Sequence, residues 1–196
     1  AGVDRIITMD LHSPQIQGFI NIPFDHLYSR ITLLDEIKKM NLNEESGVVL
    51  APDVGSAAMS QSYAKKAGLG FALIDKRRKK HNEAEVANLI GDLENKHAII
   101  IDDMIDTAGT ICNAAKTAIN KGANSVFAMA THPVLSGPAV ERLSNSKLSK
   151  VIVTDTISLD DSKVFEKLEK ISVSDVFAQA IKHIVDGTSL SSMFKL

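Results

Sequence analysis

The chain has 196 residues, with 22 basic and 24 acidic side chains and a mean hydropathy of +0.03. This composition is that of a globular protein with a buried core, and the net charge of −2 excludes the broad positive field of a nucleic-acid-binding protein. Cys112 is the only cysteine, which excludes an intrachain disulfide framework and predicts a cytoplasmic protein. No apolar run approaches the roughly 18 residues that cross a membrane, so we expect no membrane partner.

Short apolar, β-branched runs recur along the chain and predict buried strands. They cover residues 5–9, 47–51, 70–74, 97–101, 125–130 and 150–154. Helical patterns follow several of them, at residues 31–40 after a Ser29 cap, 57–68, 110–122 and 172–187. Alternation of helices with continuously apolar strands predicts an α/β fold, in which a doubly wound, mainly parallel sheet carries helices on both faces.

Two stretches interrupt this pattern. Residues 10–27 are polar and punctuated by Pro and Gly, and residues 75–82 are dense in Lys and Arg. We expect both to be long loops, and loops of this size are uncommon in a compact domain unless they are functional. Residues 83–93 fit neither the helix nor the strand template cleanly, so both assignments stay open there.

The most informative stretch is HAIIIDDMIDTAGTI, residues 97–111. A buried strand would deliver Asp102 and Asp103 to its carboxyl end, where ligands bind in open α/β sheets. The following DTAGT turn and helix start would aim backbone N–H groups at one point, which suits a phosphate. The aspartate pair then suits sugar hydroxyls or a hydrated divalent cation. The alternative is that Asp106 and Thr107 only cap a helix and that the aspartate pair lies in a polar loop.

The full pattern of four apolar residues, DD, two residues and DTAGT resembles the phosphoribosyl pyrophosphate motif of phosphoribosyltransferases and ribose-phosphate pyrophosphokinases. Four further segments resemble the pyrophosphokinases in family order, namely residues 9–27, 51–55, 72–86 and 131–143. The resemblance covers essentially the whole chain and implies a type I phosphoribosyltransferase-like fold. It also implies a magnesium-dependent enzyme of nucleotide biosynthesis, which transfers the diphosphoryl group of ATP to O1 of ribose 5-phosphate and gives phosphoribosyl pyrophosphate and AMP.

The resemblance assigns the sugar-phosphate ligands residue by residue. Asp102 and Asp103 would hold the ribose hydroxyls. The 5-phosphate would be held by Asp106, Thr107, Ala108, Gly109 and Thr110. Lys76 and Arg78 of the basic run would be the catalytic pair that stabilises negative charge in the transition state, whereas composition alone makes that run a solvated loop.

The cation ligands are assigned in the same way. His12 and Asp53 would hold the Mg²⁺ that accompanies ATP, and Asp10 and Asp25 match further acidic positions associated with divalent ions in some relatives. A lone histidine such as His12 is otherwise a structural or surface residue. The position of Asn21 carries an acidic residue in some relatives. The neutral asparagine here weakens the case for a second cation site.

The chain also departs from the family pattern. Ser56 replaces a glycine, and Met59 with Ser60 lies where the family often has arginine, so a positive charge near the phosphates is lost. This departure keeps open a second hypothesis, a non-catalytic regulatory subunit of the same family. A nucleobase phosphoribosyltransferase is a third.

The family normally has two similar α/β domains. We therefore expect residues 1–28 to be the end of an amino-terminal domain with a metal and ATP loop, and residues 29–196 to be the catalytic domain. The isolated chain should bind ribose 5-phosphate but turn over poorly. The resemblance implies a homo-oligomer of dimers assembling to a hexamer, with inorganic phosphate as an activator. Ser136 and the following helix start could form a second anion nest, and the alternative is that residues 131–139 are an ordinary strand-to-helix connection. The resemblance implies that this region contributes to oligomer contacts and to an effector site for phosphate or ADP.

Overall fold

The computed structural model describes residues 2–77 and 86–194. Its main body is a seven-stranded sheet with the strand order β5-β4-β3-β6-β7-β8-β9. The strands are β3 (Gly47–Ala51), β4 (Gly70–Arg77), β5 (Val86–Ile90), β6 (His97–Ile105), β7 (Ser125–Pro133), β8 (Lys150–Thr154) and β9 (Leu168–Ile171). Every neighbouring pair is parallel except β4 with β5, which is antiparallel. The predicted, mainly parallel sheet is confirmed.

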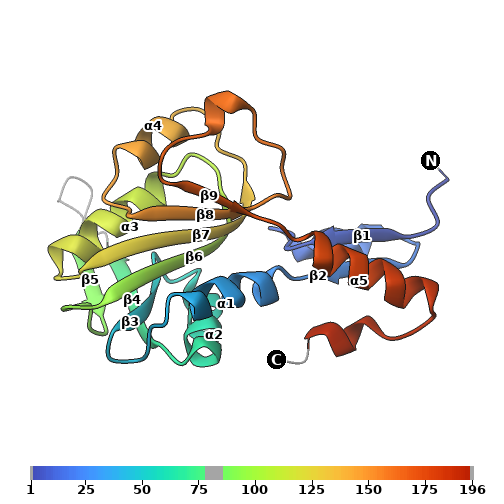
Figure 1. Ribbon diagram of the computed structural model, residues 1–196, viewed down its shortest axis with the longest axis horizontal. Coiled ribbons are helices and arrows are strands. Elements are labelled where there is room, and N and C mark those ends of the chain that lie inside the picture. Colours follow the sequence, from blue (N-terminus) through green and yellow to red (C-terminus); the bar gives the residue numbers. More distant parts are fainter. Residues whose placement is uncertain (1, 78–85, 195–196) are drawn as a thin grey trace.

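Helices cover both faces of this sheet (Figure 1). They are α1 (Arg30–Lys39), α2 (Ala57–Ala67), α3 (Gly109–Asn120) and α4 (Ala139–Ser144). Successive side chains of a strand point to opposite faces, so Ile99 and Ile101 pack with Leu33 of α1, whereas Ile100 packs with Ile111 of α3. Each such buried side chain contributes roughly 1.5–3 kcal/mol relative to an exposed one. The continuous apolar run of β6 is therefore explained by burial on both faces.

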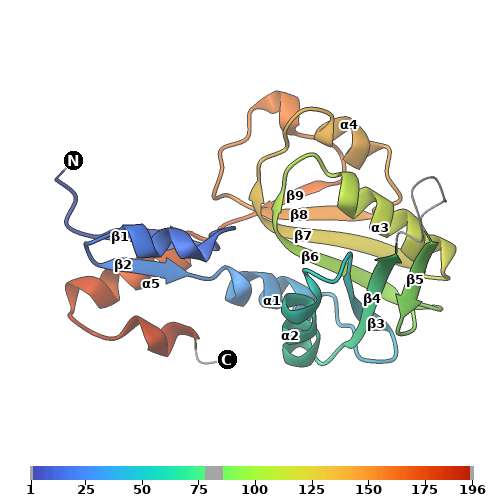
Figure 2. The same cartoon turned by 180° about the vertical axis from the view of Figure 1, so that it is seen from behind.

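A second, smaller unit lies beside the main sheet, at the opposite end of the molecule from β5 (Figures 1 and 2). It consists of the parallel strands β1 (Ile6–Met9) and β2 (Phe24–Leu27) with the long helix α5 (Ser174–Val185). Its apolar core joins Met9, Leu27, Val173, Val176 and Ala180. Short 3-10 helices complete the chain at η1 (Pro14–Phe19), η2 (Asp161–Lys163) and η3 (Leu190–Phe194).

The loop predictions were less accurate than the strand predictions. The expected loop at residues 10–27 contains η1 and the strand β2. Its four residues FDHL lack an apolar run, which is why the pattern did not indicate a strand. In the expected loop at residues 75–82, residues 75–77 continue β4, and the remainder lies outside the described residues. Residues 86–90, where both assignments were open, form β5.

All four predicted helices are present within one or two residues of their expected limits. Helix α2 ends at Gly68, whose φ of 67° is the left-handed conformation that glycine adopts at helix ends. Ser29 occupies the N-cap position of α1, but its side chain makes no capping hydrogen bond. Within the described ranges, no helix combines the length and apolar character required to cross a lipid bilayer.

Candidate ligand site at the switch point of the sheet

The sheet has a topological switch point between β3 and β6. The chain proceeds from β3 outward to β4 on one side, and β6 returns to the other side of β3 and continues to β7. Crevices that bind ligands in open α/β sheets lie at the carboxyl ends of the strands at such a point. Asp53 follows β3, and Asp102 with Asp103 lies in the second half of β6. The sequence-predicted acidic residues therefore meet at this crevice.

The half-buried carboxyl of Asp102 is the most perturbed acid at this edge. Burial raises its pKa to about 7, and the negative charges of Asp103 and Asp53 act in the same direction. Its Oδ1 accepts a hydrogen bond of 2.9 Å from the Asp103 N–H, which only partly offsets these effects. Three carboxyls thus repel one another here, which marks the crevice as a place where hydroxyl donors or a cation would bind favourably.

His12 reaches this acidic group from the small unit. Its Nδ1 lies 2.7 Å from Oδ2 of Asp103, although 91 residues separate the two in sequence. The loop between β1 and η1 carries His12, so the contact joins the two parts of the molecule. The structure therefore brings together His12 and Asp103, with Asp53 close enough to act on the pKa of the neighbouring Asp102.

The loop that leads from β6 into α3 forms a small pocket. Ala108 has a left-handed φ of 61° and is buried, and this turn directs the chain into α3 at Gly109. No side chain caps the amino end of α3, so its first backbone N–H groups are available to an anion. The pocket has a volume of about 150 Å³, and it is lined by Asp102 and residues 104–111. All the residues assigned to the 5-phosphate line it.

A second loop braces the first. The Leu135 N–H donates to the Ile105 carbonyl at 2.9 Å, and the Ser136 N–H donates to the Asp106 carbonyl at 3.1 Å. The Ser136 hydroxyl also donates to the Asp106 carboxylate. Ser136, which the sequence offered as part of a second anion nest, thus directs its side chain to the first loop instead.

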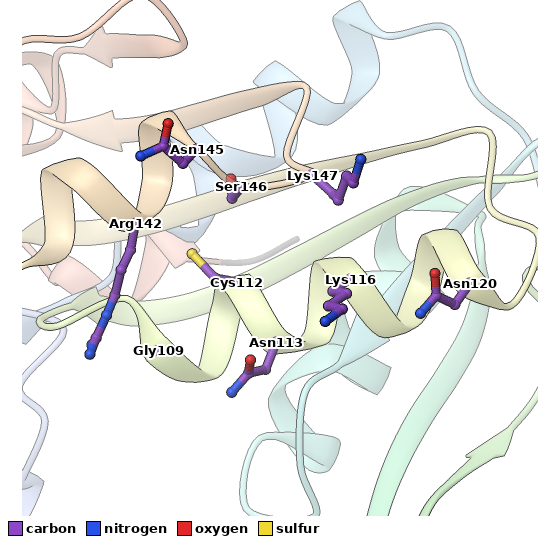
Figure 3. A pocket seen from close by; sticks show the side chains of 9 residues that line it. All are labelled: Gly109, Cys112, Asn113, Lys116, Asn120, Arg142, Asn145, Ser146 and Lys147. Atoms are coloured by element: carbon purple, nitrogen blue, oxygen red, sulfur yellow. The ribbon is translucent and has the colours of Figure 1, made fainter.

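Arg142 of α4 provides a further brace. Its Nη1 donates a hydrogen bond of 3.0 Å to the Thr107 carbonyl. Figure 3 shows the side chain of Arg142 extending toward Gly109 at the start of α3, whereas Lys147 lies farther along the same groove. This groove has a volume of about 490 Å³. Arg142 gave no signal in the sequence, because a single exposed arginine on a short helix has no distinguishing pattern.

The other predicted cation ligands are occupied by protein groups. Oδ2 of Asp10 accepts from the Ser29 N–H at 3.0 Å and from the Thr131 hydroxyl at 2.8 Å. Asp25 pairs through both oxygens with Arg5. Asp53 accepts from the backbone N–H at position 56 at 3.0 Å. Across residues 2–77 and 86–194, no group of three or more His, Cys, Asp or Glu is arranged to hold a metal ion. The metal assignment stays a prediction.

The catalytic pair can be placed only in part. Arg78 lies outside the described residues, as does the rest of the basic run after it. The backbone of Lys76 belongs to β4. Strands β3 and β4 are parallel with Ala51 opposite Leu73, so Lys76 lies beyond the carboxyl end of β3, at the same edge of the sheet as Asp53.

Sequence reasoning missed a groove next to Asp103. It has a volume of about 310 Å³ and is lined by Asp10, Leu11, Pro14, His26, Tyr28, Arg30, Met59, Ser62, Tyr63 and Asp103. The rings of His26 and Tyr28 lie 4.8 Å apart, and the Arg30 guanidinium lies 5.8 Å from the centre of the Tyr28 ring. Burial raises the pKa of Tyr63. The groove is assembled from four segments, and no local pattern could have revealed it.

The fold and this edge of the sheet define a doubly wound α/β protein with an acidic strand end and a glycine-containing loop at its switch point. The family model described as phosphoribosyl synthetase-associated domain matches residues 82–195, which is more than half of the chain. The chain belongs to this family.

Individual relatives agree with this assignment. The chain is 50% identical over 194 residues to a ribose-phosphate pyrophosphokinase of Chlorobaculum tepidum, covering 99% of this chain and 59% of the relative. It is also 50% identical to one of Aquifex aeolicus, of which it covers 62%. A crystal structure of phosphoribosylpyrophosphate synthetase from Mycobacterium smegmatis superposes with a TM-score of 0.84 at 35% identity, covering 95% of this chain and 60% of that one. The chain thus spans about three fifths of the length of these relatives.

Proposed function

We propose that the protein containing this chain is a ribose-phosphate diphosphokinase, which transfers the diphosphoryl group of ATP to O1 of ribose 5-phosphate and forms phosphoribosyl pyrophosphate and AMP. The observation that carries this proposal is the position of the Asp102–Asp103 pair and the loop 106–110 together at the switch point. Identity of 50% to pyrophosphokinases along almost the whole chain supports the same reaction.

In this proposal the loop binds the sugar phosphate. The uncapped amino end of α3 and the Thr107 and Thr110 hydroxyls would donate to the 5-phosphate, while Asp102 and Asp103 would bind the ribose hydroxyls. A pKa of about 7 allows the Asp102 carboxyl either to donate or to accept such a bond at neutral pH. The braces from Ser136 and Arg142 would keep the loop in its binding geometry before the sugar arrives.

Magnesium is the cofactor that this reaction implies. Among residues 2–77 and 86–194 no three His, Cys, Asp or Glu side chains are arranged to hold it, so water and polyphosphate oxygens would have to complete its coordination beside the few protein donors near Asp103. The carboxylates of Asp53 and Asp103 and the imidazole of His12 are oxygen and nitrogen donors, and a cation would relieve the repulsion that raises the pKa of Asp102. When bound, Mg²⁺ would neutralise charge on the polyphosphate. Asp25 suits this role less well, because Arg5 pairs with both of its oxygens, and Asp10 accepts two protein donors on Oδ2, whereas Asp53 accepts one backbone N–H.

Charge that develops on the transferred group requires cations from the protein. Lys76 and Arg78 are proposed for this role on the basis of the family resemblance, and the backbone position of Lys76 at the Asp53 edge is compatible with it. The reaction needs no covalent intermediate, because positioning and charge neutralisation suffice for phosphoryl transfer. The domain boundary after residue 28, a cytoplasmic homo-oligomer and activation by inorganic phosphate remain predictions of the same resemblance.

A second candidate is a non-catalytic subunit of the same family. The observation that favours it is Met59, an apolar residue that lines the groove beside Asp103 where relatives often carry arginine. Ser60 does not bear on the loss of a positive charge from the groove, since its side chain is buried and does not line the groove. Arg30 lines the same groove and offers a positive charge there, which favours the catalytic proposal.

Product analysis distinguishes these functions. The full gene product would be incubated with ATP, Mg²⁺ and ribose 5-phosphate, and the products would be resolved by phosphorus NMR. The catalytic proposal predicts AMP and a diphosphate ester at C1 of the sugar. ADP with a singly phosphorylated C1 would show transfer of one phosphoryl group and contradict it. Binding of ribose 5-phosphate without any product would favour the non-catalytic subunit.

A further inference from the structure

A network of buried polar side chains connects the small unit to the main sheet. In the described part of the chain, the fully buried polar residues are Ser29, Ser60, Thr131 and Thr154, and all except Ser60 belong to this network. The Thr131 hydroxyl donates to the Asp10 carboxylate at 2.8 Å. The Ser29 hydroxyl lies 2.7 Å from the Thr131 hydroxyl. Buried polar networks that are fully hydrogen-bonded fix one geometry, because any displacement leaves an unpaired group.

His132 is the centre of this network. Its Nε2 lies 3.0 Å from the Met9 carbonyl and 3.0 Å from the Asp10 carbonyl. Carbonyl oxygens only accept, so Nε2 carries the proton and shares it between the two. The Nδ1 atom lies 2.9 Å from the Thr156 hydroxyl, which also lies 2.9 Å from the Thr131 carbonyl. The Thr131 carbonyl accepts from the Thr154 hydroxyl at 2.6 Å and from the Thr156 hydroxyl. The single proton of the Thr156 hydroxyl is therefore shared between this carbonyl and Nδ1, and the contact with Nδ1 orients the ring.

The segment that His132 holds makes a sharp turn. Asp10 has a positive φ of 40°, a conformation that side chains adopt rarely and that therefore needs support from its surroundings. Two residues after this turn, the exposed His12 ring contacts Asp103 of strand β6, which lies next to β7. The Leu11 N–H donates to Nε2 of His26 at 2.9 Å. The turn at Asp10 thus determines whether His12 faces the candidate crevice.

We propose that His132 is a positioning residue, which clamps the Met9–Asp10 backbone to the end of β7 and thereby places His12 beside Asp103. The effect of His132 on turnover rests on the proposed function, whereas the placement of His12 beside Asp103 does not. His132 lies at the carboxyl end of β7, and its ring touches only backbone carbonyls and Thr156 among the partners that the structure gives it. Its role is therefore exerted through His12.

Two substitutions separate the N–H donor from the bulk of the ring. His132→Phe keeps an aromatic ring but removes the donor, and His132→Gln restores an N–H donor of similar reach. His97→Phe is the matched control, because His97 is also half-buried and lies on the adjacent strand β6, where its ring contacts the Ser125 hydroxyl at the amino end of the strand. All variants would be made in the full gene product.

The first readout is amide hydrogen exchange, which requires no activity. In His132→Phe we expect the Leu11 amide to exchange about tenfold faster, because the turn that holds it is released. His132→Gln should exchange within about threefold of the parent, and His97→Phe should leave Leu11 unchanged. Equal acceleration in the Phe and Gln variants, or none in the Phe variant, would overturn the clamp.

The second readout is kinetic. His132→Phe should raise the Mg²⁺ concentration for half-maximal velocity about tenfold or more, in the range seen when a partner that orients a metal ligand is removed. The dissociation constant for ribose 5-phosphate should stay within about twofold, because the loop 106–110 makes no hydrogen bond to the network in the structure, and displacement of His12 leaves the Asp103 carboxylate in place to bind the ribose. An equal rise in the half-maximal Mg²⁺ concentration and in the dissociation constant for ribose 5-phosphate would indicate general damage and contradict a positioning role.

A variant that fails to fold would not end the test. Thr156→Val leaves the ring in place and removes only the hydroxyl beside Nδ1, so it should give the same pattern with smaller changes, about threefold in each readout. If the parent forms no AMP, the proposed function fails, while the Leu11 exchange still decides the clamp. If AMP forms and Leu11 is insensitive to His132, the clamp alone fails.

Discussion

The guanidinium of Arg142 donates a hydrogen bond to the Thr107 carbonyl, so helix α4 supports the loop that leads into α3. Replacing Arg142 with Met keeps the apolar stem and removes this bond. We expect ribose 5-phosphate to bind about fivefold to tenfold more weakly, since the loop loses a fixed donor worth roughly 1 kcal/mol. Titration calorimetry would measure the change.

Lys147→Met is the matched control for that experiment. Lys147 lines the same groove and carries the same charge, but the structure records no bond from it to the loop (Figure 3). If both substitutions weaken sugar binding equally, general positive charge is responsible, and the contact with Thr107 is not.

Lys76 should affect turnover more than binding. Lys76→Ala removes a cation proposed to stabilise charge that exists only in the transition state, so turnover should fall by about two orders of magnitude or more while the dissociation constant for ribose 5-phosphate changes little. Lys96→Ala serves as the control, because Lys96 is a half-buried lysine just before the amino end of β6, away from the candidate site. Unchanged turnover in Lys76→Ala would remove this residue from the mechanism.

The raised pKa of Asp102 predicts that the free energy of unfolding depends on pH. Its pKa is raised from 3.8 to about 7 by burial and by two neighbouring carboxylates. Between these values the unfolded chain has lost the proton and the folded protein retains it, so the free energy of unfolding falls as pH rises through this window and then levels off. The side-chain amide introduced by Asp102→Asn cannot ionise, but its oxygen can still accept the bond from the Asp103 N–H.

Asp102→Asn should therefore stabilise the protein relative to the parent by about 2–4 kcal/mol at pH 8, and by little at pH 4. Urea unfolding at both pH values, without divalent cations, would measure it. Asp4→Asn, at an exposed position, should give no such difference. A gain of equal size at pH 4 and pH 8 would show that ionisation of Asp102 is not its cause.

Ser60 offers a test of polar burial. Its hydroxyl is fully buried in α2, and no partner for it exists among the described residues. Ser60→Ala should raise the free energy of unfolding by about 1 kcal/mol, since it removes an unpaired hydroxyl. Ser29→Ala deletes the same atom where it is hydrogen-bonded to Thr131, and it should lower stability by a similar amount. Urea unfolding of both variants would show whether the signs are opposite.

The sequence predicted those parts of the fold that local patterns encode. The central strands of the main sheet have continuous apolar runs, because helices bury them on both faces, and these strands were found. The strands β2 and β9 were missed, because their residues are mostly half-buried and their sequences, FDHL and LEKI, mix polar with apolar side chains. The strand β5 stayed open because it lies antiparallel at an edge, where the apolar pattern is weak.

The candidate site divides in the same way. The Asp102–Asp103 pair and the loop 106–110 were predictable, because one continuous segment carries both the strand end and the helix start. Contacts between distant segments were not, as the pair His12–Asp103 and the bond from Arg142 to Thr107 show. Such contacts depend on how the small unit and α4 pack against the sheet, which no local spacing reveals.

Transfer of a diphosphoryl group from ATP to ribose 5-phosphate leaves AMP behind, so the dependence of AMP formation on the sugar is the decisive measurement. The full gene product would be assayed with ATP and Mg²⁺, with and without the sugar phosphate, while AMP and phosphoribosyl pyrophosphate are measured together. We expect AMP to form only when the sugar is present and in equal amount to phosphoribosyl pyrophosphate. AMP formed equally without sugar, or no AMP from a protein that binds ribose 5-phosphate, would contradict it.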